Sequence, residues 1–139
     1  MKKDAQKKQI RWQKISEEAS KQCGRGAVPV VHMPEKFSIV VDRLVSENDS
    51  SDTLFIMPYE NETDRTLKSV LKEYSAGLEP GGNIKRICVF IGPEGGFSKK
   101  ETEYAISKGF ITVTLGKRIL RTETAGIATI AAIRYEIGD

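Results

Sequence analysis

The chain has 139 residues, of which 39% are hydrophobic, and these values fit one domain with a single core. Lys and Arg number 22 against 19 Asp and Glu, a surplus too small to indicate a nucleic-acid partner by itself. No apolar run approaches the roughly 20 residues of a membrane helix, and no apolar signal core follows the first residues. We therefore expect a cytoplasmic protein.

The cysteines and the histidine do not indicate a metal site. Cys23 and Cys88 lie far apart and have no CxxC partner, which argues against both a disulfide framework and bound zinc. We expect both thiols to be buried and inert, because a free cysteine behaves as a small hydrophobe. His32 has no candidate ligand nearby in the sequence. We interpret the cluster of Lys and Arg in the first 14 residues as a solvated helix face.

The first half of the chain predicts alternating helices and strands. Trp12, Ile15, Ala19 and Cys23 recur at helical spacing, and Gly24 follows where a helix would end. A short β-branched run before His32 is typical of a strand, whereas the run that begins at Phe37 fits neither period cleanly and is assigned as a helix. The expected elements are a helix over 4–22, a strand over 28–32, a helix over 37–45, a loop over 46–52 and a strand over 53–57.

The second half continues the alternation. Ser98 and Glu101 form the pattern of a capping box, and either Thr122 or Thr124 is expected to cap the last helix, with Glu123 in its first turn. The expected elements are a helix near 67–74, a connector over 77–83, a strand over 86–91, a helix over 98–108, a strand over 110–115 and a helix from about 122 to 137. This order predicts an α/β fold, a mostly parallel sheet with helices on both faces and ligands beyond the carboxyl ends of its strands.

Two connections between strand and helix carry unusual sequence. The first is IGPEGGF, residues 91–97, whose glycines would allow positive φ and leave backbone amides near a ligand. It matches neither the dinucleotide fingerprint nor the P-loop, so a plain tight turn and a ligand-binding loop both stay open. The second, residues 115–125, contains two arginines and a glutamate. Ile119 and Leu120 are expected to be buried there and so to hold the neighbouring arginines in fixed directions.

The strings IGPEGGFSKKE and LGKRILRTETA together resemble the signature of the 16S rRNA uridine-N3 methyltransferases, a family of the SPOUT superfamily. RWQKISEEASKQCGRGAVPVV is similar to the family's preceding helix and strand, so the resemblance spans almost the whole chain. It implies a C-terminal trefoil knot, S-adenosyl-L-methionine (SAM) as cofactor, 16S rRNA of the small ribosomal subunit as substrate, and a homodimer. The dimer would pack the knot-region helices together, and the last helix offers Ile127, Ile130, Ala131 and Ile133.

Three loops would hold the cofactor if the resemblance is carried over residue by residue. They are residues 55–58, 91–96 and 115–120. The implied cofactor-binding residues are Met57, Pro58, Ile91, Gly92, Glu94, Gly95, Gly96, Leu115, Gly116, Arg118, Ile119, Leu120, Thr124 and Ala125.

Methylation at N3 of a uracil makes two demands on a catalytic site. A group must accept the imide proton, and a cation should offset the negative charge that develops on the ring. We assign the second role to Arg121, with Arg118 assisting or binding a phosphate. Glu94 and Glu123 are both candidates for the first role, and their order stays open. No metal is needed, because the sulfonium already activates the methyl group.

Complete members of the family carry an RNA-binding PUA-like domain, then a first strand and helix, whereas this chain begins almost at the tryptophan-bearing helix. We therefore expect a truncated form with little activity on ribosomal RNA. Two other functions remain open. One is a non-catalytic module for RNA binding or dimerisation, and the other is an enzyme that binds a nucleotide phosphate at the 92–96 loop.

Overall fold

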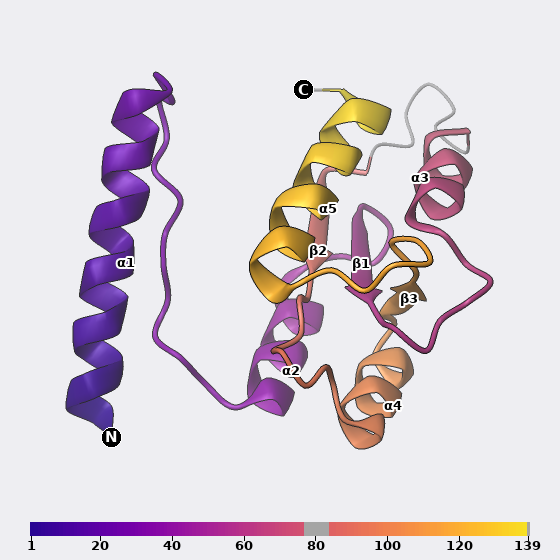
Figure 1. Cartoon of the computed structure of the whole chain (residues 1–139), viewed down its shortest axis with the longest axis horizontal. Coiled ribbons are helices and arrows are strands. Elements are labelled where there is room, and N and C mark those ends of the chain that lie inside the picture. Colours follow the sequence, from indigo (N-terminus) through magenta and orange to yellow (C-terminus); the bar gives the residue numbers. More distant parts are fainter. Residues whose placement is uncertain (77–83, 139) are drawn as a thin grey trace. The chain divides into compact units, whose positions relative to one another are not determined.

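The computed structural model describes residues 1–76 and 84–138, and the predicted connector over 77–83 lies outside them. The elements within the described residues are α1 (Lys2–Gln22), α2 (Phe37–Glu47), β1 (Thr53–Pro58), α3 (Leu67–Ala76), β2 (Arg86–Val89), α4 (Lys99–Ser107), β3 (Ile111–Val113) and α5 (Thr122–Ile137) (Figure 1). The chain forms two units, Met1–Lys36 and Phe37–Asp139. Among the described residues, no helix has the length and apolar character needed to cross a membrane.

The first unit is α1 and the segment that returns along it. The predicted helix is confirmed, but the strand expected over 28–32 is wrong. Gln13 accepts a hydrogen bond from the backbone N–H of Val31 (2.8 Å), and Ser16 donates to the carbonyl of Pro29 (2.7 Å). The backbone groups of the segment therefore bond side chains of α1. A strand would instead require hydrogen bonds to the backbone of a neighbouring strand.

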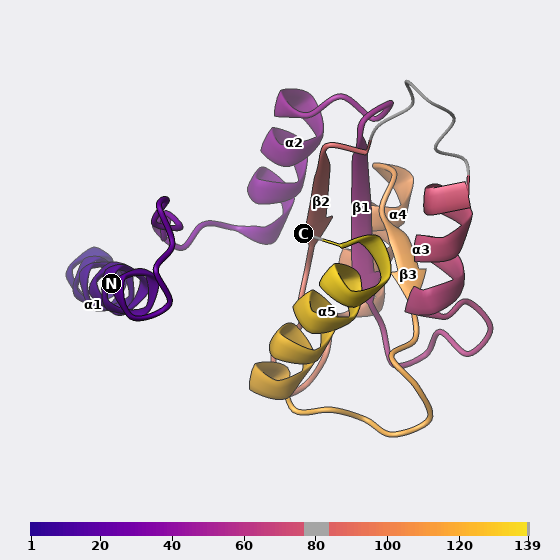
Figure 2. The same cartoon turned by 90° about the horizontal axis from the view of Figure 1, so that it is seen from above.

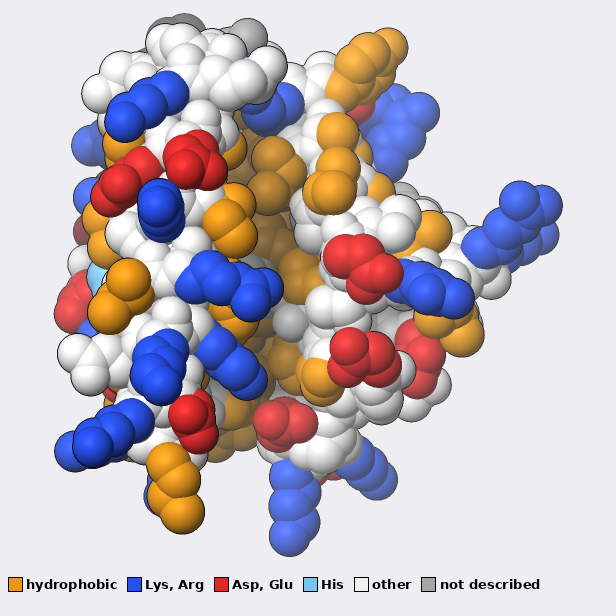
Figure 3. Space-filling view, turned by 60° about the vertical axis from the view of Figure 1, so that its left-hand side comes forward, with side chains coloured by type: hydrophobic (Ala, Val, Ile, Leu, Met, Phe, Trp, Pro, Cys, Tyr) orange, Lys and Arg blue, Asp and Glu red, His pale blue; other side chains and the backbone are white. Residues whose placement is uncertain are grey.

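The helix α1 buries little of its own surface. Trp12 and Ile15 are 41% and 53% exposed, and Cys23 is exposed, so the expectation of a buried thiol is wrong there. Cys88, on β2, is half-buried, and burial raises the pKa of its thiol. The space-filling view shows Lys and Arg side chains interspersed with acidic and hydrophobic ones along the unit that contains α1 (Figure 3).

The second unit is a parallel sheet in the order β2-β1-β3, with helices on both faces (Figure 2). Side chains of the central strand alternate between two cores. Leu54 and Ile56 pack with α3 and with Ile133 of α5, whereas Phe55 and Met57 pack with α2 and α4. Burial on both faces explains why β1 is apolar at consecutive positions. The predicted fold class, a parallel sheet between helices, is confirmed.

The two outer strands are shorter than predicted. β3 ends at Val113, opposite Pro58, the last residue of β1, whereas β2 ends at Val89, opposite Ile56. The backbone N–H of Phe90 still donates to the carbonyl of Ile56 (3.0 Å), but the chain leaves the sheet beyond it. On the other side, Thr114 N–H donates to the carbonyl of Arg65 (2.8 Å), which belongs to a loop. The residues that follow each strand are thus released to line the carboxyl end of the sheet.

The helix caps agree with the sequence in one case and differ in the other. The capping box of α4 is confirmed, since Ser98 Oγ accepts from Glu101 N–H (3.1 Å) and Glu101 accepts from Ser98 N–H (2.9 Å). The N-cap of α5 is Arg121, which makes no side-chain cap bond, so the expected threonine cap is wrong. Thr122 is already the first helical residue, and its hydroxyl bonds another loop. Glu123 lies in the first turn as predicted.

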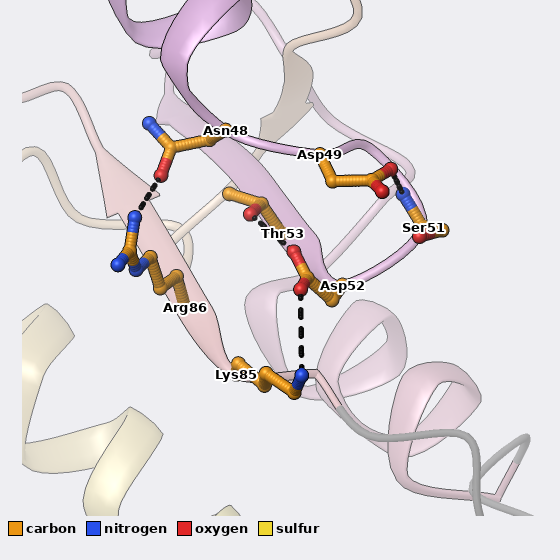
Figure 4. A network of polar contacts seen from close by, with 7 residues as sticks. All are labelled: Asn48, Asp49, Ser51, Asp52, Thr53, Lys85 and Arg86. Atoms are coloured by element: carbon orange, nitrogen blue, oxygen red, sulfur yellow. Dashed lines mark hydrogen bonds and ion pairs between the residues drawn. The ribbon is translucent and has the colours of Figure 1, made fainter.

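Polar contacts close the amino end of the sheet (Figure 4). Arg86 Nη1 donates to Asn48 Oδ1 at 2.7 Å, and Lys85 Nζ lies 3.9 Å from Asp52 Oδ2. Asp49 accepts from the backbone N–H of Ser51 (2.9 Å), and this bond is the main reason why the pKa of Asp49 is lowered. The 46–52 loop is therefore tied to the start of β2, and the opposite end of the sheet is left to the glycine-rich loops.

Candidate functional site

A cleft of about 500 Å³ lies at the carboxyl end of the sheet. It is lined by the residues that follow each of the three strands. They are Pro58, Tyr59 and Glu60 after β1; Ile91, Gly92, Pro93, Glu94, Gly96 and Phe97 after β2; and Thr114, Leu115, Gly116, Lys117, Arg118, Ile119, Leu120, Arg121, Thr122, Glu123 and Ala125 after β3. This is where a parallel sheet binds its ligands.

The loop after β2 is shaped by two of its glycines. Gly96 has φ +73°, and its N–H donates to the carbonyl of Pro93 (2.8 Å), which closes a turn. A Cβ on Gly92 would lie 3.2 Å from the ring of Phe97, and that ring in turn packs against Phe37 with centroids 5.7 Å apart. Gly95 has open space around it and does not line the cleft. The resemblance had implied a cofactor contact for all three glycines.

The loop after β3 starts with a tight turn. Thr114 Oγ1 accepts from Gly116 N–H (3.2 Å) and donates to Gly116 O (3.1 Å), and Gly116 has φ +128°, which favours glycine. The chain then crosses the carboxyl end of β1 to begin α5 beside the loop after β2 (Figures 1 and 2). There the hydroxyl of Thr122 donates to the carbonyl of Gly92 at 2.9 Å.

The segment after β1 contributes a carboxylate that was not predicted from the sequence. Tyr59 N–H donates to the carbonyl of Val113 (3.0 Å), and Tyr59 and Glu60 then line the cleft. Glu60 Oε1 then lies 3.5 Å from where a Cβ on Gly96 would be. The implied cofactor loop ended at Pro58, but a carboxylate two residues after a strand at this edge is a sequence signal for the site.

Six charged side chains line the cleft: Glu60, Glu94, Glu123, Lys117, Arg118 and Arg121. Within the described ranges, no ion pair or side-chain hydrogen bond engages any of them. Ile119 is 80% exposed, so the expectation that it is buried and holds the arginines is wrong. The three cations are therefore free to turn toward an anionic ligand, while the carboxylates opposite can receive a cation or a proton.

The structure brings most of the predicted site residues together. Three of them do not line the cleft. Met57 is fully buried between the sheet and α2 and α4, Gly95 faces open space, and Thr124 is exposed. The lining residues that had not been assigned to the site from the sequence are Tyr59, Glu60, Pro93, Phe97, Thr114, Lys117 and Thr122. Among the described residues, no three His, Cys, Asp or Glu side chains cluster in a way that could hold a metal ion.

Known proteins are similar to this chain in sequence. The chain is 36% identical over 138 residues to the ribosomal RNA small subunit methyltransferase E of Buchnera aphidicola from Schizaphis graminum, a match that covers 96% of this chain and 48% of that protein. The Bacillus subtilis protein of the same name is 32% identical over 134 residues, covering 96% and 49%. The chain thus spans about half the length of the curated relatives that it matches.

Solved structures share the fold. A ribosomal RNA small subunit methyltransferase E from Neisseria gonorrhoeae, bound to S-adenosyl methionine, is 35% identical with a TM-score of 0.72, over 95% of this chain and 49% of that one. A methyltransferase from Legionella pneumophila, in complex with bound SAM, is 28% identical with a TM-score of 0.75, over 97% and 49%. The family described as the RNA methyltransferase domain matches residues 1–134. Because this match takes in both units and every residue of the cleft, the chain belongs to the RNA methyltransferase domain family.

Proposed function

We propose that this chain is the cofactor-binding part of a SAM-dependent methyltransferase that acts on N3 of a uridine in 16S ribosomal RNA of the small subunit, in the cytoplasm. The observation that carries the proposal is the cleft, which two glycine-shaped loops build at adjacent strand ends. Relatives that share this fold bind SAM, and the name shared by several relatives specifies a small-subunit ribosomal RNA methyltransferase.

The residues of the cleft suit the proposed cofactor. Its volume of about 500 Å³ lies in the range of small-molecule sites. Ile91, Leu115 and Leu120 offer apolar surface for a purine ring, and the loop backbone offers hydrogen bonds to its edge. Glu60, Glu94 and Glu123 are carboxylates able to receive the ammonium group of the methionine moiety. When bound, SAM supplies a methyl group that its sulfonium already activates, so no metal is required.

The chain's own side chains meet the two demands of the reaction. The imide proton of the uracil passes to a carboxylate, for which Glu94, Glu123 and Glu60 are the candidates in the cleft. Arg121, at the start of α5, offsets the negative charge that spreads over the ring oxygens and N3 as the proton leaves. Arg118, on the exposed part of the same loop, is placed to assist it or to bind a phosphate of the RNA.

We further propose a SPOUT-type trefoil knot and a homodimer. The crossing of the 114–121 connection over the end of β1 supports the first part of this proposal. For the dimer, Ile127 and Ile130 of α5 are 73% and 60% exposed, more apolar surface than one solvated helix usually presents. Ile133, which was expected on the same face, packs toward the sheet and α3.

A titration of this chain with SAM, followed by calorimetry, tests the proposed cofactor. We expect saturable 1:1 binding per chain, and no comparable binding of ATP. Preferential binding of ATP would favour a nucleotide-phosphate enzyme, and RNA binding without SAM affinity would favour a non-catalytic module. Either result would overturn the proposal.

The substrate is tested by methyl transfer from labelled SAM to small ribosomal subunits, followed by mapping of the modified base. This chain and a form extended to the full length of its relatives are compared, because it spans about half of them. We expect 3-methyluridine in 16S rRNA from the longer form and little turnover from this chain, since phosphate contacts outside it would position the RNA. Methylation at another atom or in another RNA would contradict the proposed substrate.

A further inference from the structure

The loops after β2 and β3 meet through one side chain. Thr122 Oγ1 donates to the carbonyl of Gly92 at 2.9 Å, across 30 residues of sequence. Within the described part of the chain, this contact, which we call the Thr122 clasp, is the one hydrogen bond between these two loops. Its partners come from opposite edges of the sheet, because β2 and β3 flank the central β1.

The surroundings of the clasp keep its two ends in place. On the acceptor side, Gly92 is held against the ring of Phe97, since a Cβ there would approach that ring to 3.2 Å. On the donor side, the start of α5 lies close to Ile91, the residue before Gly92, since a Cβ on Gly126 would lie 4.0 Å from Ile91 Cγ1. Ala125, between these contacts, is buried. The hydroxyl therefore bonds a fixed acceptor in a half-buried place, where such a bond is stronger than in water.

The rest of the loop after β3 has few such restraints. Lys117, Arg118 and Ile119 are exposed, and the N-cap residue Arg121 makes no side-chain cap bond. The two side chains that flank Thr122 are Arg121 and Glu123, both of which line the cleft. The hydrogen bond from Thr122 to Gly92 therefore sets the position of these two residues relative to the loop after β2.

We propose that Thr122 is a positioning residue. Its hydroxyl couples the two glycine-rich loops, so that the cleft binds its cofactor as one preformed unit and the backbone that carries Arg121 is held in a fixed place. The part that concerns the cofactor rests on the proposed function. The coupling of the loops is a property of the protein without ligand. Preformed sites bind more tightly because less freedom is lost on binding.

Three variants separate the hydroxyl from the rest of the side chain. Thr122→Val keeps the shape of the side chain and removes the hydroxyl donor. Thr122→Ala removes both the donor and the branched shape, and Thr122→Ser keeps the donor. Thr53→Val is the matched control, since Thr53 is a buried threonine whose hydroxyl bonds Asp52 Oδ1 at 3.0 Å, at the amino end of the sheet (Figure 4). Circular dichroism first establishes that each variant is folded.

The first readout needs no ligand. Amide hydrogen exchange is measured over 91–97 and over 115–121. We expect Thr122→Val and Thr122→Ala to exchange roughly fivefold faster over both loops, the effect of one lost hydrogen bond on a local opening. Thr122→Ser and Thr53→Val should match the parent there. Equal exchange in all variants would overturn the proposal, as would a Thr122→Ser variant that behaves like Thr122→Val.

The second readout is SAM affinity by calorimetry, where we expect roughly a fivefold loss for Thr122→Val and recovery in Thr122→Ser. An unchanged affinity beside faster exchange would overturn the role in cofactor binding. If the parent itself binds no SAM, the proposed function fails, and the exchange measurement still decides whether the two loops are coupled.

Discussion

Gly92, Gly95 and Gly96 lie within five residues, yet the structure gives each a different environment. Gly92 meets the ring of Phe97, Gly96 has a positive φ beside Glu60, and Gly95 has neither a neighbour within 4 Å nor a positive φ. We predict that Gly92→Ala weakens SAM binding by at least roughly fivefold, because displacing the ring costs about 1 kcal/mol or more. Gly95→Ala should bind SAM as the parent does. Calorimetry on both variants decides, and equal losses would contradict this division.

Glu62 links the loop after β1 to β3. Its carboxylate accepts from Arg65 N–H (2.9 Å) and from Thr112 Oγ1 (3.0 Å), and the bond from Arg65 is the main cause of its lowered pKa. A lowered pKa in the folded state means that this stabilisation is present above the ordinary value of 4.5 and is lost as the pH falls through the folded-state pKa.

We therefore predict that the free energy of unfolding declines as the pH is lowered from about 5 to 3, and that Glu62→Gln removes part of this decline. Urea denaturation at a series of pH values measures it. Glu73→Gln, an exposed glutamate on α3, is the control and should keep the parent's pH dependence. An identical slope in parent and Glu62→Gln would show that the carboxylate does not contribute.

The two thiols should differ in reactivity. Cys23 is exposed at the end of α1, whereas burial raises the pKa of Cys88 and keeps its thiol protonated. We predict that a thiol reagent modifies Cys23 in the native protein at least about tenfold faster than Cys88. Mass spectrometry of the labelled peptides assigns the sites, and denaturation should make both react at similar rates. Faster labelling of Cys88 would contradict the packing of β2 against α2 and α4.

At the scale of elements, α4 holds the exit of the loop after β2. Its capping box satisfies backbone donors at a helix end that directly follows Phe97. We predict that Ser98→Ala lowers the free energy of unfolding by about 1 kcal/mol. Ser107→Ala, which removes an exposed hydroxyl from the last turn of the same helix, should change it by less than about 0.5 kcal/mol. Thermal unfolding of the two variants measures the difference. Similar losses in the free energy of unfolding would show that the capping hydroxyl stabilises the protein no more than an ordinary exposed one.

At the scale of the whole molecule, the outward face of α5 is the proposed dimer contact. Ile127→Glu and Ile130→Glu place charges on it, and we expect either to weaken dimerisation at least about tenfold, because an unpaired charge would be buried. Ile106→Glu, on the half-exposed surface of α4, serves as the control and should leave the association unchanged. Sedimentation over a range of concentrations measures it. A monomeric parent, or dimers that all variants retain, would contradict this contact.

Much of the fold could be predicted from the sequence because its signals are local. Helical spacing, the apolar runs of buried parallel strands and the Ser98 to Glu101 pattern each depend on a few neighbouring residues. The glycine-rich strings likewise marked the two loops that line the cleft. Their positive φ values at Gly96 and Gly116 are what glycine allows most readily.

Other features depended on partners that are distant in sequence. The run over 28–32 has strand-forming residues, but a strand needs a paired neighbour, and Gln13 and Ser16 of α1 bond that backbone instead. Met57 faces the core because successive side chains of a strand point to opposite faces of the sheet. The face on which Met57 lies is set by the register of β1 against β2 and β3. The place of Glu60 beside Gly96, and of Thr122 beside Gly92, follows from the crossing of chain segments over the sheet, which no local pattern encodes.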